Sequence, residues 1–131
     1  MANKKVLVVD DEVHILHVVA IKLRNNGFDV VTAQNGSDAL EIIKEQSPDM
    51  IVTDYKMPGM TGLEMIQKIR ESHLVKAVPV VMLTARGFAV DPEQLDEYDI
   101  AEFLSKPFSP KELLRIVEDV LFYRESAVKS D

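Results

Sequence analysis

The chain contains no cysteine, which excludes disulfide bonds, thiolate metal sites and catalysis by a thiol nucleophile. Its longest uncharged apolar stretch, residues 77–85, is too short to span a bilayer. Only a few apolar residues precede Asp10, which is not the pattern of a signal peptide, so we expect a cytoplasmic protein with no membrane partner. A net charge of −7 argues against direct binding of nucleic acid.

The composition that remains is that of one globular domain. The 131 residues are 47% hydrophobic and 28% charged, which is sufficient for a single domain with a substantial core. The sequence shows no internal repeat and no low-complexity segment. We assign residues 1–125 to this domain and residues 126–131 to a polar tail.

Short apolar runs alternate with helical patterns along the chain. Five of these runs are typical of buried strands, near residues 6–9, 30–32, 50–52, 78–84 and 102–105. Capping residues and helix-ending residues predict five helices, over residues 13–25, 35–46, 61–72, 91–98 and 109–123. The alternation predicts an α/β fold with a five-stranded parallel sheet covered on both faces. The simplest doubly wound strand order is 2-1-3-4-5, as in flavodoxin-like folds.

Polar side chains follow four of the five predicted strands. Asp10 and Asp11 follow the first strand, Asp54 the third, Thr84 the fourth and Lys106 the fifth. These strands are neighbours in the predicted order, so the five side chains meet at one edge of the sheet. Clustered carboxylates need a counter-charge, and oxygen ligands beside a lysine favour Mg²⁺ over zinc or copper. The set suits phosphoryl transfer to a carboxylate nucleophile, although each residue alone is more often a cap or a surface charge.

Four sequence blocks, in this order, resemble the signature of response-regulator receiver domains, the chemotaxis-Y-like modules of two-component signalling. The blocks are residues 8–12, 54–62, 83–85 and 105–108. The resemblance implies a signalling switch in which Asp54 accepts a phosphoryl group from a phosphohistidine of a sensor kinase or of a histidine phosphotransfer protein. It also implies that the protein is not an enzyme beyond its own Mg²⁺-dependent phosphorylation and dephosphorylation.

The same resemblance assigns roles to the other polar residues. Mg²⁺ would be held by Asp11, Asp54 and the backbone carbonyl of Lys56, with Asp10 helping through water. Thr84 and Lys106 would bind the phosphoryl group. Phe103 stands at the position of the family's switch aromatic.

Two departures from the family pattern concern the output face and not the acid cluster. The family often has a Gly-Ala-type turn before the fifth strand, where this chain has residues 99–102, Asp-Ile-Ala-Glu. The loop over residues 86–90, followed by Asp91-Pro92, would shorten the fourth helix.

Partner surfaces are predicted on the first and last helices. Ile15 and Val18 fall outside the inward stripe of the first helix yet lie near the acid cluster, so we interpret them as a docking site for the phosphoryl donor. Exposed apolar residues are common, so a purely structural reading of them also stands. The last helix offers a face for a possible homodimer. The output would come from a separate partner or from an output domain that this sequence does not include.

Three other functions remain as alternatives. A phosphohydrolase that works through an aspartyl phosphate usually has an Asp-x-Asp pattern, but Asp54-Tyr55-Lys56 has no second acid. A flavodoxin-like cofactor binder needs a phosphate loop after the first strand, where this chain has residues 10–12, Asp-Asp-Glu. A degenerate receiver used only for pairing would not need the intact set of acids.

Overall fold

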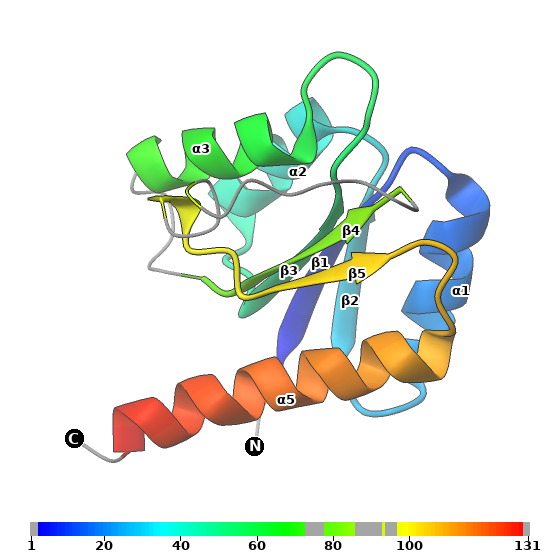
Figure 1. Cartoon of the computed structure of the whole chain (residues 1–131), viewed down its shortest axis with the longest axis vertical. Coiled ribbons are helices and arrows are strands. Elements are labelled where there is room, and N and C mark those ends of the chain that lie inside the picture. The colour runs from blue at the N-terminus through cyan, green and yellow to red at the C-terminus, as the bar shows by residue number, and fades with distance from the viewer. Residues whose placement is uncertain (1–2, 73–77, 86–92, 94–96, 130–131) are drawn as a thin grey trace.

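The computed structural model describes residues 3–72, 78–85, 93 and 97–129, with side chains to residue 122. The strands are β1 (Lys5–Val9), β2 (Asp29–Ala33), β3 (Met50–Asp54), β4 (Val80–Thr84) and β5 (Glu102–Ser105). The helices with defined bounds are α1 (Val13–Arg24), α2 (Gly36–Glu45), α3 (Gly62–Ser72) and α5 (Pro110–Lys129). All strand pairs are parallel and the order is β2-β1-β3-β4-β5, which confirms the predicted doubly wound sheet (Figure 1).

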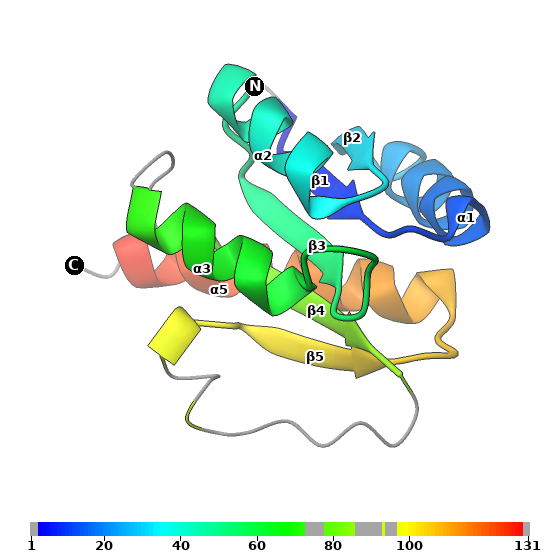
Figure 2. The same ribbon diagram turned by 90° about the horizontal axis from the view of Figure 1, so that it is seen from above.

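The helices form one layer on each face of the sheet. Buried side chains of α1 and α5 pack with one set of strand residues, and those of α2 and α3 pack with the other set. Figure 2 shows this sandwich from above, with α2 and α3 on the side of the sheet opposite α1 and α5. Each layer has its own core cluster, so both faces of the sheet are covered.

The continuous apolar strands follow from this double cover. In β1, Val6 and Val8 point to the α1 and α5 layer, whereas Leu7 and Val9 point to the α2 and α3 layer. Successive strand residues face opposite sides of a sheet, so a strand buried on both sides has no polar position until its end. The first polar residue after β1 is Asp10, and it marks the edge where the site is built.

Side-chain caps set the starts of the helices as the sequence predicted. The Asn35 side chain accepts a hydrogen bond from the backbone N–H of Asp38 at 2.8 Å, at the start of α2. Thr61 and Glu64 form the reciprocal capping box of α3, with bonds of 3.1 and 3.0 Å. At α5, the Ser109 hydroxyl accepts from the backbone N–H of Glu112 at 3.0 Å. The inward stripe predicted for α1 is also confirmed, and consists of Leu16, Val19, Ala20 and Leu23.

Two helix predictions need comment. The last helix was expected to end near residue 123, but α5 continues to Lys129, over most of the segment assigned to a polar tail. No glycine or proline follows Pro110, so nothing in the sequence breaks the helix there. The fourth helix, predicted over residues 91–98, lies largely outside the described residues. None of the helices in the described ranges has the length and hydropathy needed to cross a membrane.

The turn before β5 replaces the expected glycine by Asp99. Asp99 has φ 53°, in the left-handed region that glycine adopts most easily and aspartate tolerates better than most residues. Arg70 on α3 donates hydrogen bonds to the carbonyls of Tyr98 and Asp99 at 3.2 and 3.3 Å. The chain thus makes this turn with a left-handed residue other than glycine, and Arg70 connects the turn to α3.

Gly62 lets α3 begin directly against the end of β3. Its backbone N–H donates to the carbonyl of Tyr55 at 2.8 Å. A Cβ atom at Gly62 would collide with the backbone carbonyl of Asp54, which cannot move without shifting the strand end. Gly36, the first residue of α2, offers a contrast: there a Cβ would meet the flexible side chain of Met60, with the sulfur at 2.8 Å.

We therefore expect Gly62→Ala to lower the free energy of unfolding by about 1–3 kcal/mol, the usual range for overpacking against a rigid neighbour. Gly36→Ala is the matched control, because it adds the same methyl group at the same helix position against a side chain that can rotate. Urea denaturation measures both. Equal stability of the two variants would show that the Asp54 backbone is not rigidly placed.

Candidate functional site

The strand register brings the polar residues to one edge of the sheet. Val9 pairs with Thr53, Asp54 pairs with Leu83, and Thr84 pairs with Ser105. Asp10 and Asp54 therefore lie at the same level of the sheet, and Lys106 follows two residues beyond Leu104, which pairs with Leu83. The Thr53 hydroxyl, fully buried, donates to the carbonyl of Asp54 at 3.0 Å and helps to fix the end of β3.

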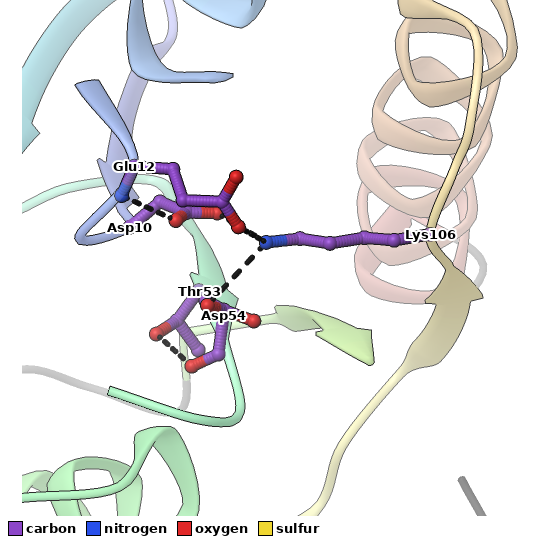
Figure 3. A network of polar contacts seen from close by, with 5 residues as sticks. All are labelled: Asp10, Glu12, Thr53, Asp54 and Lys106. Carbon is purple, nitrogen blue, oxygen red and sulfur yellow. Dashed lines mark hydrogen bonds and ion pairs between the residues drawn. The ribbon is translucent and has the colours of Figure 1, made fainter. Parts of the chain in front are cut away.

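The ammonium of Lys106 is the centre of the site (Figure 3). It donates to Asp10 Oδ2 at 3.0 Å and to Glu12 Oε1 at 3.1 Å, and it forms an ion pair with Asp54 Oδ2 at 3.4 Å. Asp10 and Lys106 are 96 residues apart in sequence, so only the fold brings them together. Three negative charges thus share one positive charge within the site.

Because two of these carboxylates are buried, the excess negative charge is poorly solvated and shifts the pKa values of the site. Asp10 is fully buried and Asp54 is 5% exposed. Burial, followed by the negative charge of Asp10, raises the pKa of Asp54 to about 6, although Lys106 opposes the rise. Burial also raises the pKa of Asp10, against the hydrogen bonds from the Glu12 backbone and from Lys106. For Lys106, burial alone would lower the pKa, but the contacts with Asp10 and Glu12 outweigh it and raise the pKa.

The other predicted residues lie around this centre. Asp11 and Lys56 are exposed and line a cavity of about 450 Å³ that also contacts Asp54 and Lys106. Thr84 is buried at the end of β4, where its carbonyl accepts from the backbone N–H of Lys106 at 2.8 Å. The roles in metal and phosphoryl binding assigned to these residues remain predictions.

Phe103 and Thr84 share a face of the sheet on neighbouring strands. Phe103 pairs in register with Met82, which is two residues before Thr84, and side chains two apart in a strand point the same way. Phe103 is half-buried against the cluster that covers the α2 and α3 face.

Glu12 is a member of the site that the sequence reasoning did not assign. It stands immediately after Asp10 and Asp11, at the start of α1, where an acidic residue is ordinarily explained by the helix dipole. The signal that could have found it is the run of three acids at one strand end opposite the single lysine that follows β5.

The donor chemistry of the site fits a hard divalent cation. Asp10, Glu12 and Asp54 each offer a carboxylate oxygen, and these oxygens lie within 4.8 Å of one another. Carboxylate oxygens in a small cluster suit Mg²⁺, which binds through one or two carboxylates and keeps several waters. Asp11 and Lys56 line the same cavity, and their predicted part in metal binding stays a prediction.

A second cavity adjoins the acid site. Its volume is about 520 Å³, and its apolar wall includes Ile15, Val18, Pro107 and Phe108. It shares three lining residues with the cavity over Asp54, namely Glu12, Ala85 and Lys106. The two docking residues predicted on α1 therefore line a cavity next to the acid cluster.

Comparison with known proteins agrees with this geometry. Residues 6–118 match the response regulator receiver domain family. The phosphate regulon transcriptional regulatory protein PhoB of Pseudomonas aeruginosa is 34% identical over 92% of the chain, which covers 53% of that protein. The chain thus spans about half the length of the curated relatives it matches.

Solved structures give the same result. The chemotaxis response regulator CheY4 of Vibrio cholerae is 33% identical, with a TM-score of 0.80 over 90% of this chain and 98% of that one. The receiver domain of a sensor histidine kinase of Pseudomonas aeruginosa is 28% identical, with a TM-score of 0.79 over 92% of this chain and 98% of that one. That structure has a magnesium ion coordinated in its active-site cleft. The chain therefore belongs to the CheY-like response regulator receiver domains, the modules of two-component signalling.

Proposed function

We propose that the chain is a phosphorylation-controlled switch that accepts a phosphoryl group on Asp54, with Mg²⁺, from a phosphohistidine of a sensor kinase or histidine phosphotransfer protein. The observation that carries the proposal is the buried Asp54 carboxylate beside the Lys106 ammonium, at 3.4 Å. A buried acid with a raised pKa and a fixed cation beside it is a candidate nucleophile for phosphoryl transfer.

The reaction needs little beyond position and charge. An oxygen of Asp54 forms a bond to phosphorus while the bond from phosphorus to the donor imidazole nitrogen breaks, and that nitrogen keeps the electron pair. With a pKa of about 6, Asp54 is mostly ionised at neutral pH and can attack. The Lys106 ammonium and the Thr84 hydroxyl can each donate a hydrogen bond to an oxygen of the transferred phosphoryl group. Asp11, Asp54 and the Lys56 carbonyl, with Asp10 through water, would hold Mg²⁺, which would supply positive charge to the phosphoryl oxygens.

Other features of the chain agree with a signalling role. Receiver domains are in general not classical enzymes, and the position two residues after Asp54 carries Lys56, not the second acid of a phosphohydrolase. We place the protein in the cytoplasm, without direct contact with nucleic acid or a membrane. Because relatives such as PhoB are about twice as long, the output would come from a partner or from a further domain.

The switch is proposed to run through Thr84 and Phe103. Movement of the Thr84 hydroxyl toward a phosphoryl group would open space on the face that it shares with Phe103. Phe103 has no hydroxyl, so its inward rotation leaves no polar group without a partner. Phosphorylation would thereby shift the population between two positions of Phe103 and alter the surface beside β5. The exposed face of α5, which includes the 70% exposed Phe122, is the proposed homodimer surface.

The donor is proposed to dock in the 520 Å³ cavity beside the site. Ile15 and Val18 are half-buried on α1 and form its wall, and the cavity joins the acid site at Glu12, Ala85 and Lys106. A donor histidine must come within bonding distance of Asp54. An apolar surface next to the acid site can bind the protein that carries this histidine.

The first prediction concerns the acceptor. With Mg²⁺ and acetyl phosphate, the wild-type protein should take up one phosphoryl group, and Asp54→Asn should reduce the uptake at least about a hundredfold, because the nucleophilic oxygen is gone. Intact-mass spectrometry measures the added mass. Asp29→Asn is the matched control, because Asp29 is exposed at the opposite end of the sheet. Uptake that persists in Asp54→Asn, or in chelator, contradicts the proposal.

The second prediction concerns the switch. Addition of beryllofluoride and Mg²⁺ should move amide NMR signals along β5 to Phe103 and into α5. In Thr84→Ala, the signals near Asp54 should still move, but those at Phe103 should move by less than half as much, because the hydroxyl that links the two is absent. Shifts confined to the loops around Asp54 in the wild-type protein would show that Phe103 does not respond.

The third prediction concerns docking. Ile15→Ala combined with Val18→Ala should slow transfer from a phosphorylated histidine protein about five- to thirtyfold, as expected for loss of apolar anchors, but leave transfer from acetyl phosphate unchanged. Ile21→Ala is the control, because Ile21 is 56% exposed on the same helix and does not line the cavity. Equal losses with both donors would indicate a damaged fold in place of a lost docking surface.

A further inference from the structure

We propose that Glu12 is a positioning residue whose carboxylate holds the Lys106 ammonium beside Asp54. The effect of Glu12 on phosphorylation rests on the function proposed above, but its hold on Lys106 is a property of the unphosphorylated protein. In this proposal Glu12 orients Lys106 and is not a ligand of the metal ion.

The contacts of Glu12 form a closed ring. Its backbone N–H donates to Asp10 Oδ1 at 2.9 Å, and its side-chain Oε1 accepts from Lys106 Nζ at 3.1 Å. The ring closes where Lys106 donates to Asp10 Oδ2 at 3.0 Å. Glu12 therefore orients both partners of the central ion pair: its backbone N–H holds Asp10, and its side chain holds Lys106.

The position of Glu12 in α1 supports the same role. Glu12 is the N-cap residue of this helix, with φ −87° and ψ 103°, yet its side chain makes no capping hydrogen bond among the described residues. By contrast, Asn35 and Thr61 do cap α2 and α3 with their side chains. Glutamate is not among the preferred N-cap residues. The Glu12 side chain contacts Lys106 and does not cap the helix.

Lys106 needs such a holder. An ammonium has three donors, and those toward Asp10 and Glu12 are used at 3.0 and 3.1 Å, whereas Asp54 is at 3.4 Å. The lysine side chain is long and rotatable, and it is 18% exposed, so it has a path toward solvent. Asp10 is fully buried, whereas the Glu12 side chain is 58% exposed. Glu12 therefore closes the solvent side of the ammonium.

The same geometry argues against Glu12 as a metal ligand. The ammonium already contacts one oxygen of each of the three clustered carboxylates, Asp10, Glu12 and Asp54. Glu12 Oε1 is held at 3.1 Å from the ammonium and Asp54 Oδ2 only at 3.4 Å, so a divalent cation would compete with Lys106 more directly at Glu12 than at Asp54. Asp11 lines the cavity over Asp54 and forms no ion pair with Lys106 among the described residues, so it can bind a cation without that competition.

The experiment measures the motion of Lys106 in the metal-free protein. In Glu12→Gln, the NMR order parameter of the Lys106 terminal methylene group should fall toward that of Lys44, a surface lysine with 54% exposure. Glu41→Gln is the matched control, because it removes an exposed carboxylate at the same 3.1 Å from a lysine far from the site. That control should leave Lys106 unchanged.

Kinetics and Mg²⁺ titration supply the second readout. With acetyl phosphate, Glu12→Gln should lower the rate constant at saturating donor about two- to fivefold, the scale of one exposed ion pair, with little change in KM. Its loss of Mg²⁺ affinity should be smaller than that of Asp11→Asn.

An unchanged Lys106 order parameter in Glu12→Gln would overturn the proposal, as would a loss of Mg²⁺ affinity equal to that in Asp11→Asn. If the wild-type protein accepts no phosphoryl group, the proposed function fails, but the order parameter still decides the role of Glu12.

Discussion

The burial of two carboxylates beside one lysine is the interaction on which the rest of the site depends. Asp10 and Asp54 are almost without solvent, and Lys106 is the cation that contacts both. Such a group of charges is expensive to bury unless each partner is held within contact distance. The parallel sheet provides that precision, because Asp10, Asp54 and Lys106 each stand at the end of a strand whose register is fixed by its neighbours.

The surrounding structure keeps these strand ends in place. The Thr53 hydroxyl donates to the carbonyl of Asp54, and the Gly62 backbone N–H donates to the carbonyl of Tyr55. Both hydrogen bonds fix the backbone around Asp54. Gly62 is required less for a special φ than for the absence of a side chain, because the carbonyl of Asp54 occupies the space of a Cβ atom. The site therefore consists of the buried residues Asp10 and Asp54 and of exposed residues around them, Asp11, Glu12 and Lys56.

The positions of the buried site residues were easier to predict from the sequence than the contacts of the exposed ones. The short apolar runs and their alternation with helices predicted the strands and their order, so Asp10, Asp54 and Lys106 could be placed at one edge of the sheet. The contact of Glu12 with Lys106 could not be predicted, because it depends on a rotamer choice between capping α1 and reaching across the site. The end of α5 was missed because a polar composition does not by itself stop a helix that meets no glycine or proline.

The raised pKa of Asp54 joins stability to function. Because its folded value, about 6, lies above the ordinary value of 3.8, the folded protein binds this proton more tightly than the unfolded chain does. The contribution of Asp54 to stability therefore falls as the pH rises from about 4 to 6, and at neutral pH the ionised carboxylate destabilises the metal-free fold. Lys106 offsets part of this cost, and any further cation at the site relieves more of it. The same unrelieved charge that weakens the fold thus favours a divalent cation beside Asp54, the proposed phosphoryl acceptor.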